Sequence, residues 1–208
     1  MSRETKPVPK SLKSERHSTS QPNSLILTPT IDLETGWEFV STLSSSGQGR
    51  TFQTFSDSRG DRPDLVSIHH SHIYMRVATK LACLNQKGAG VFFTVNETDG
   101  MGRKSENIVR VRALFVDADN VRIPERWHLE PDFCVWRDPQ HWHAYWLVND
   151  CPLGRFADSQ RQLARHYGTD PSVCDLPRVM RVPGFMHCKG TPTPVFFKRG
   201  GLYRADVE

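Results

Sequence analysis

Residues 141–148, HWHAYWLV, alternate polar and apolar side chains with the two-residue period of a β-strand. One face would carry His141, His143 and Tyr145, and the other would carry Trp142, Ala144, Trp146 and Val148. A strand with this pattern belongs to a sheet that buries one face and keeps the other polar. The chain must therefore build a two-faced sheet, and its polar face is where a functional site is expected.

Other segments repeat the strand signal or show the helical period. Helices are expected within 34–43, 64–87 and 155–168, the second from the spacing of Ile73, Val77, Leu81 and Leu84. Further strands are expected at 50–57, 90–96, 108–119, 132–137 and 193–199, with a hairpin around Asp138-Pro139-Gln140. Residues 169–190 look irregular. The pattern predicts a single α+β domain with a mixed or antiparallel sheet flanked by helices.

Composition excludes several classes of protein. No apolar run approaches the roughly 20 residues that span a bilayer, and the N-terminus lacks the apolar core of an export signal. Five cysteines without a C-x-x-C pair favour a reducing cytoplasm over a disulfide framework. We therefore expect a cytoplasmic protein with no membrane partner.

Charge is unevenly distributed along the chain. Residues 1–23 are rich in Ser, Pro and Lys and have little to bury, which predicts a disordered basic arm before a domain at 24–208. Residues 151–208 carry nine Lys or Arg against five Asp or Glu, whereas the middle of the chain is acidic. This distribution suits a protein that holds an anion beside carboxylates, although ordinary surface charge would also produce it.

The segment ALFVDADN, residues 113–120, ends an apolar strand with two carboxylates. Asp117 and Asp119 would project to the same face, about 6–7 Å apart. Such a pair repels itself unless a cation lies nearby, and Mg²⁺ or Mn²⁺ prefers carboxylate oxygens. The alternative is a solvated strand end.

Asp175, Arg178 and Arg181 form a third group, within DPSVCDLPRVMRVPG. Prolines and a glycine make this segment rigid and non-helical. The arginines could bind phosphate oxygens while the carboxylate binds metal, or they could form structural salt bridges with it.

Taken together, VDAD, HWHAYWLV and GTDPSVCDLPRVMRVPG resemble, in this order, the archaeo-eukaryotic primase superfamily. The likeness is closest to its plasmid and phage branch of RepB-type primases and primase-polymerases. LNQKGAGVFFTVNETDG extends the likeness over roughly 50–190. The resemblance implies the RRM-like catalytic core of those enzymes.

The same resemblance implies roles for individual residues. Asp117, Asp119 and Asp175 would bind the catalytic Mg²⁺ or Mn²⁺, and His143 would contact the phosphates of the incoming nucleotide. Arg178 and Arg181 would contact phosphate or template. The chain departs from the family motif by placing His141 where a small residue is usual.

The resemblance implies two-metal nucleotidyl transfer from nucleoside triphosphates on a single-stranded DNA template, during plasmid or phage replication. Because the chain has no G-x-x-x-x-G-K-[ST] loop, a separate replicative helicase is an expected partner.

Three other interpretations remain open at this level. In a His-hydrophobic-His endonuclease, His141 and His143 would bind one metal and Tyr167 would attack DNA. The domain could instead be an inactive DNA-binding accessory. Zinc at Cys174, His187 and Cys188 is a further alternative, although its spacing fits no strong template.

Overall fold

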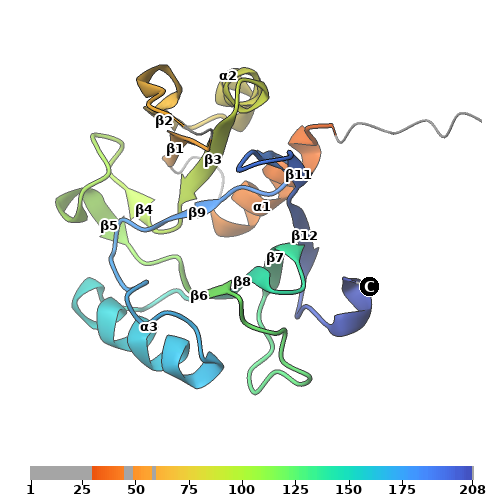
Figure 1. Ribbon diagram of the computed structural model, residues 1–208. Helices are drawn as coiled ribbons and strands as arrows, with labels where there is room; N and C mark the ends of the chain where they lie inside the picture. Colours follow the sequence, from red (N-terminus) through yellow and green to blue (C-terminus); the bar gives the residue numbers. More distant parts are fainter. Residues whose placement is uncertain (1–29, 45–48, 58–59, 208) are drawn as a thin grey trace, which may run out of the picture.

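The computed structural model describes residues 30–44, 49–57 and 60–207. The predicted basic arm at 1–23 lies outside these ranges. The described chain forms two four-stranded antiparallel sheets, two small strand pairs and three helices (Figure 1), so the α+β prediction is confirmed.

The first sheet has the strand order β2-β1-β3-β9. Its strands are β1 (Arg50–Ser56), β2 (Ser67–Ser71), β3 (Ala89–Thr94) and β9 (Val179–Arg181). All three neighbouring pairs are antiparallel. Strand β9 lies in the segment that the sequence left irregular, and β2 occupies the start of a segment expected to be helical.

The second sheet has the order β12-β7-β8-β6 and is also antiparallel. Its strands are β6 (Ala113–Asp119), β7 (Phe133–Asp138), β8 (His141–Leu147) and β12 (Phe196–Arg199). The predicted hairpin is therefore β7–β8. The long strand expected at 108–119 is divided, because β5 ends at Arg110 and pairs with β4 instead.

The remaining elements are short or helical. The small strand pairs join β4 (Glu97–Thr98) to β5 (Ile108–Arg110) and β10 (Met186–His187) to β11 (Thr193–Pro194). The helices are α1 (Leu33–Leu43), α2 (Tyr74–Gln86) and α3 (Leu153–Tyr167), with single 3₁₀ turns η1 (Pro63–Leu65), η2 (Ser105–Asn107) and η3 (Arg204–Asp206). No helix in the described ranges is long and apolar enough to cross a bilayer.

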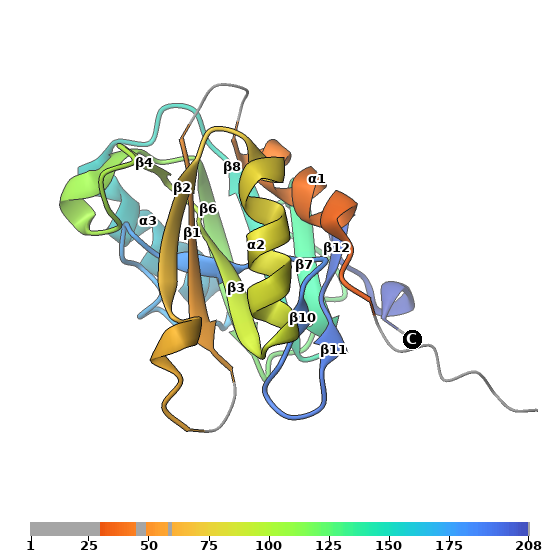
Figure 2. The same cartoon turned by 90° about the horizontal axis from the view of Figure 1, so that it is seen from above.

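The main core lies between the sheets and the helices. Helix α2 packs on the first sheet and contacts β1, β2 and β3. Figure 2 shows it running alongside β3, with α1 beside it. The buried aromatic side chains of this core include Phe39, Phe52, Phe93, Phe115, Phe133 and Tyr145. Tyr145 stacks on Phe133 with ring centroids 4.5 Å apart, which fixes β7 and β8 relative to each other.

A second core covers the opposite face of the second sheet. Its buried members include Val116, Ala118, Cys134, Trp127, Trp142, Ala144 and Trp146. The alternation in HWHAYWLV therefore assigned Trp142, Ala144 and Trp146 to the correct face, and the histidines lie on the other. Val148 packs against the main core instead, and the histidine face is not polar throughout, because Tyr145 is buried there.

Helix α1 depends on the far end of the domain for its position. Asp32 caps the helix by accepting hydrogen bonds from the Glu34 and Thr35 amides at 3.0 and 3.1 Å. The Asp32 amide in turn donates to the Gly184 carbonyl at 2.7 Å. Gly184 has a positive φ of 79°, and a Cβ there would lie 2.1 Å from the Asp32 carbonyl oxygen. Only glycine fits this contact.

Candidate active site

The register of β6 against β8 brings the predicted acidic pair and the two histidines together. Asp117 lies opposite His143, and Asp119 lies opposite His141. The nearest atoms are 3.4 Å apart between Asp117 Oδ1 and His143 Nε2, and 3.1 Å apart between Asp119 Oδ1 and His141 Nε2. All four side chains thus lie on one face of the sheet. The alternation predicted the shared face within each strand, and the pairing of β6 with β8 brings the two pairs together.

His143 is the more buried histidine of the two. Burial lowers the pKa of His143, and the nearby Asp117 carboxylate only partly opposes this. Burial also raises the pKa of Tyr145 well above its usual value, so the phenol keeps its proton. The Tyr145 hydroxyl lies 3.3 Å from His143 Nδ1. If it donates there, the ring proton of a neutral His143 is on Nε2, facing Asp117.

His141 is held by a second carboxylate. Its Nδ1 lies 2.7 and 2.8 Å from the two oxygens of Asp138. Partial burial opposes ionisation of Asp138, but hydrogen bonds from His141, the Gln140 amide and Arg137 hold its pKa below the usual range. Asp138 is therefore a charged acceptor that orients the His141 ring.

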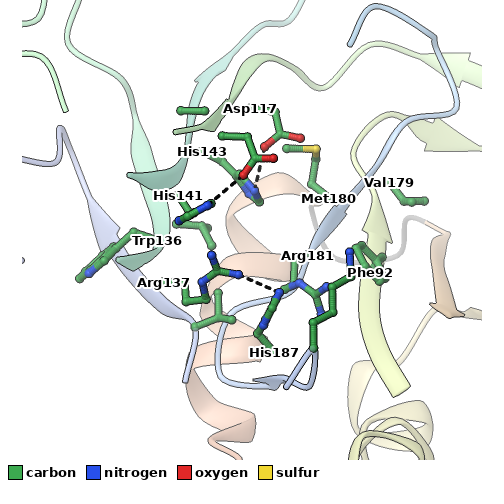
Figure 3. Close-up of a pocket in the computed structure, with 15 residues that line it drawn as sticks. Phe92, Asp117, Trp136, Arg137, His141, His143, Val179, Met180, Arg181 and His187 are labelled. Carbon is green, nitrogen blue, oxygen red and sulfur yellow. Dashed lines mark hydrogen bonds and ion pairs between the residues drawn. The ribbon is translucent and has the colours of Figure 1, made fainter. Parts of the chain in front are cut away.

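Arg137, Arg181, His187 and Lys189 form a basic wall that faces these groups across a pocket of about 210 Å³. Figure 3 shows Asp117 and His143 at one end of the pocket and Arg137, Arg181 and His187 at the other. Lys189 also lines it. The pocket lies between the two sheets, because Arg181 comes from β9 and the carboxylates from β6.

Arg181 is fixed from two sides. Its guanidinium donates to both oxygens of the buried Asp57, at 2.8 and 3.1 Å, and lies 4.5 Å from the centre of the Phe92 ring. Burial opposes ionisation of Asp57, but Arg181 and the Cys188 amide lower its pKa. The Arg181 side chain is therefore preorganised beside the pocket.

Arg137 and His187 form the other half of the wall. Arg137 donates to His187 Nε2 at 2.8 Å. Since arginine only donates, His187 must be unprotonated at that nitrogen. Burial, together with the charges of Arg181 and Arg137, lowers the pKa of His187 to about 4.

Asp175 and Arg178 do not line this pocket. Arg178 Nε donates to Asp175 Oδ1 at 2.7 Å, and the Arg178 side chain also reaches the Ser172 carbonyl. The structure therefore brings together Asp117, Asp119, His143 and Arg181 from the predicted set. It pairs Asp175 with Arg178 outside the pocket.

Tyr167 cannot serve the endonuclease alternative in this arrangement. Its ring stacks on Trp146 at 5.3 Å, and its hydroxyl donates to the Leu129 carbonyl at 3.3 Å. It belongs to the second core, on the face of the sheet opposite the histidines. The alternative therefore lacks its nucleophile.

The zinc alternative also lacks a site. Cys188 Sγ lies 3.6 Å from the Asn85 carbonyl oxygen. All five cysteines are free thiols. Within the ranges that the structure describes, no three His, Cys, Asp or Glu side chains are grouped to hold a metal.

A hard divalent cation nevertheless fits the acidic pair. The Asp117 and Asp119 side chains are 38% and 81% exposed, so their oxygens are open to the pocket. Mg²⁺ sites often use only one or two carboxylates and complete their coordination with water and substrate phosphates. Two carboxylates opposite a basic wall match that donor set.

Three residues of the pocket region were missed from the sequence: Asp57, Arg137 and Lys189. His187 was named only as a zinc-ligand candidate, and the structure places it in the pocket instead. Arg137 precedes the hairpin turn and carries no motif. Asp57 and Arg181 are separated by 124 positions, so only the fold shows that they pair. Lys189 lies five residues after the R-V-P-G segment, and this position was the one sequence feature that could have placed it near the pocket.

Comparison with solved structures defines the class of fold. The AEP domain of the primase-polymerase of cyanophage S-2L superposes with a TM-score of 0.62 at 18% identity, covering 84% of this chain and 94% of that domain. The primase RepB′ gives a TM-score of 0.54 at 18% identity, covering 79% of this chain and 56% of that one. The catalytic domain of RepB′ in complex with initiator DNA gives the same score and identity, with 84% of that chain covered. This chain spans just over half the length of RepB′.

The fold is thus that of primase catalytic domains. The chain belongs to the family of the RepB DNA-primase N-terminal domain, whose model matches residues 94–205, more than half of its length. This confirms the resemblance and the predicted function class, a primase domain of plasmid or phage replication. A search of curated proteins finds no match.

Proposed function

We propose that the pocket catalyses DNA-templated nucleotidyl transfer, in which a 3′-hydroxyl or an initiating nucleotide's hydroxyl attacks the α-phosphorus of a nucleoside triphosphate. A P–O bond forms, the bond to the β-phosphate breaks, and pyrophosphate leaves. The observation that carries the proposal is the register that pairs Asp117 with His143 opposite a basic wall. Little covalent work falls to the protein, so positioning and electrostatics should supply most of the rate.

Asp117 and Asp119 would hold the divalent cations, Mg²⁺ or Mn²⁺. When bound, the ions lower the pKa of the attacking hydroxyl and neutralise charge on the leaving group. Burial lowers the pKa of His143, and its Nε2, which lies beside Asp117 at the wall of the pocket, would contact a triphosphate oxygen. Asp175 acts through its pairing with Arg178, which would present that arginine to phosphate or template.

Arg181, Arg137 and Lys189 would bind the triphosphate. The pocket lies between two sheets, so a triphosphate there would contact β6 and β8 on one side and β9 on the other. Arg181 is held in place by Asp57, which reduces the entropy lost when it binds an anion. The wall therefore supplies preorganised charge where pyrophosphate would form.

The proposed substrates are single-stranded DNA as template and nucleoside triphosphates. A complex with initiator DNA is known for the RepB′ catalytic domain, and its fold is shared by this chain. The proposed setting is the cytoplasm, where a separate replicative helicase would supply unwound template.

The test is primer synthesis by purified protein with single-stranded DNA, labelled nucleotides and Mg²⁺ or Mn²⁺. Asp117→Asn and Asp119→Asn should abolish synthesis, since each removes a charged oxygen from the cation site. Asp175→Asn should reduce synthesis without abolishing it. Circular dichroism should be unchanged in all three.

Asp158→Asn is the matched control, because Asp158 pairs with Arg161 on the exposed surface of α3. It should synthesise primers as the unmodified protein does. Full synthesis by Asp117→Asn would contradict the proposed site. Template binding without synthesis by the unmodified protein would favour an inactive accessory domain.

A further inference from the structure

We propose that the open face of the first sheet, which carries Phe55 and Phe92, is a binding surface for single-stranded DNA, whose bases stack on these two rings. The inference rests on the proposed function and deepens it, because it gives the template strand a place on the domain. Helix α2 packs on the other face of this sheet, so the open face is the one left for a ligand.

The register of the four strands sets which side chains share the open face. Ile68 of β2 pairs with Gln53 of β1. Gln53 also pairs with Phe92 of β3, and Phe92 pairs with Arg181 of β9. Paired residues project to the same side of a sheet, and Phe55 joins them because it follows Gln53 by two positions. One row of side chains thus runs from the edge strand β2 to the wall of the pocket.

The two aromatic rings of this face are half-buried, and neither belongs to either hydrophobic core. Their centroids are 5.4 Å apart and the ring planes are inclined by 69°, so a base stacked on one ring would contact the edge of the other. Phe55 lies opposite Gly90, where a Cβ would lie 2.8 Å from Phe92 and 2.7 Å from Arg181. The glycine therefore leaves room for these side chains to form one continuous surface.

Arginines flank the rings at two places. The Arg181 guanidinium lies 4.5 Å from the centre of the Phe92 ring (Figure 3). Arg103 donates to the side-chain oxygen of Gln53 at 3.2 Å and to the Pro177 carbonyl at 3.0 Å. Neither acceptor is a carboxylate, so these contacts do not neutralise the charge of Arg103. Aromatic rings interleaved with arginines are the combination that binds the bases and phosphates of a single strand.

The position of the surface favours the template strand as its occupant. Phe92 and Arg181 line the pocket as well as the open face, so the surface continues into the proposed active site. Bases present their flat faces only outside a duplex, because a duplex stacks them on one another. A template that crosses the sheet from β2 would therefore reach the pocket with its bases unpaired, as an incoming nucleotide requires.

The experiment measures the affinity for a labelled single-stranded oligonucleotide by fluorescence anisotropy, without nucleoside triphosphate. Phe55→Ala should weaken binding about 5- to 150-fold, the loss expected for one stacked base. Phe55→Leu keeps an apolar side chain but removes the aromatic face, so it should also lose affinity, whereas Phe55→Trp should keep it. Trp37→Leu is the matched control and should bind normally, because Trp37 is an exposed aromatic residue of α1 outside the pocket.

Two further readouts separate base stacking from a structural effect. An oligonucleotide of abasic sites keeps its phosphates but has no bases, so the unmodified protein and Phe55→Leu should bind it equally. In primer synthesis, Phe55→Leu should raise the template concentration that gives the half-maximal rate, with little change in the maximal rate.

Unchanged DNA affinity in Phe55→Ala and Phe55→Leu would overturn the inference, as would an equal loss of affinity for abasic DNA. A dimer of the unmodified protein that Phe55→Leu dissociates would also overturn it, by assigning the surface to a second copy of the chain.

The two proposals fail separately. Normal DNA binding by Phe55→Leu, together with loss of primer synthesis in Asp117→Asn, would reject this inference and leave the proposed function standing. Phe55-dependent DNA binding by a protein that makes no primers would do the opposite.

Discussion

His187 shows how strongly neighbours set the state of one side chain. It accepts from Arg137, and burial and the nearby arginines lower its pKa to about 4 from an ordinary value of 6.5. The unfolded chain therefore binds more protons than the folded one between these values. The stability that His187 contributes is present above pH 6.5 and is lost as the pH falls toward 4.

The pH dependence of unfolding tests whether His187 contributes this stability. His187→Gln, whose side-chain oxygen can still accept from Arg137, should flatten the rise in urea midpoint between pH 4 and 6.5. His143, whose pKa is also lowered, should account for part of the remaining slope. His128→Gln should leave the profile unchanged. An unaltered slope in His187→Gln would show that this histidine is not held neutral.

Individual residues also show which features of the site could be predicted from the sequence. That Asp117 and Asp119 share a face could be predicted because strand alternation is a local property, whereas their position opposite His143 was implied only by the resemblance and depends on the pairing of β6 with β8. The pairing of Arg181 with Asp57 could not be predicted, because it depends on where β9 pairs with β3. Whether Arg181 binds phosphate as well stays a prediction.

At the scale of elements, α3 protects the open edge of the second sheet. β6 is an edge strand, and the buried Gln160 side chain accepts from the Phe115 amide at 2.9 Å and donates to the Phe115 carbonyl at 3.0 Å. It also donates to the Val173 carbonyl. One amide thus replaces a strand partner and holds the strand that carries the acidic pair.

Gln160→Leu should destabilise the domain by about 3 kcal/mol, because it leaves buried backbone groups without partners at about 1–3 kcal/mol each. Urea unfolding measures the loss. Gln162→Leu changes an exposed glutamine of the same helix and should have little effect. Equal stability of the two variants would mean that the hydrogen bonds from Gln160 to the edge of β6 do not stabilise the domain.

The element boundaries that the sequence missed have a common physical cause. The strand expected at 108–119 is interrupted after Arg110, and the Arg112 amide donates to the side chain of Asn96. β9 has only three residues, and it pairs with β3, which lies 85–89 positions earlier in the chain. Both features depend on contacts between distant segments, which local periodicity does not record.

At the scale of the whole molecule, the pocket exists only where the two sheets meet. One sheet supplies the carboxylates and the other supplies Arg181, so a ligand bound to both should stabilise the folded state. A nucleoside triphosphate with Mn²⁺, at about 100 times its dissociation constant, should raise the melting temperature by about 5–10 °C.

Arg137→Ala should remove most of that rise, because it deletes one of the cations facing the phosphates. Differential scanning fluorimetry with and without nucleotide measures this rise in melting temperature. Arg161→Ala, which deletes an exposed arginine of α3, should keep the full rise. A full rise in Arg137→Ala would place the triphosphate elsewhere.

The contact between Asp32 and Gly184 has a consequence for synthesis of the protein in the cell. Among the described elements, α1 is translated before the others, yet the carbonyl that its capping residue binds comes from Gly184, which is translated about 150 residues later. The first helix therefore cannot take its final position until nearly the whole domain has left the ribosome. Until then the apolar side chains of α1 lack the core against which they pack in the folded domain.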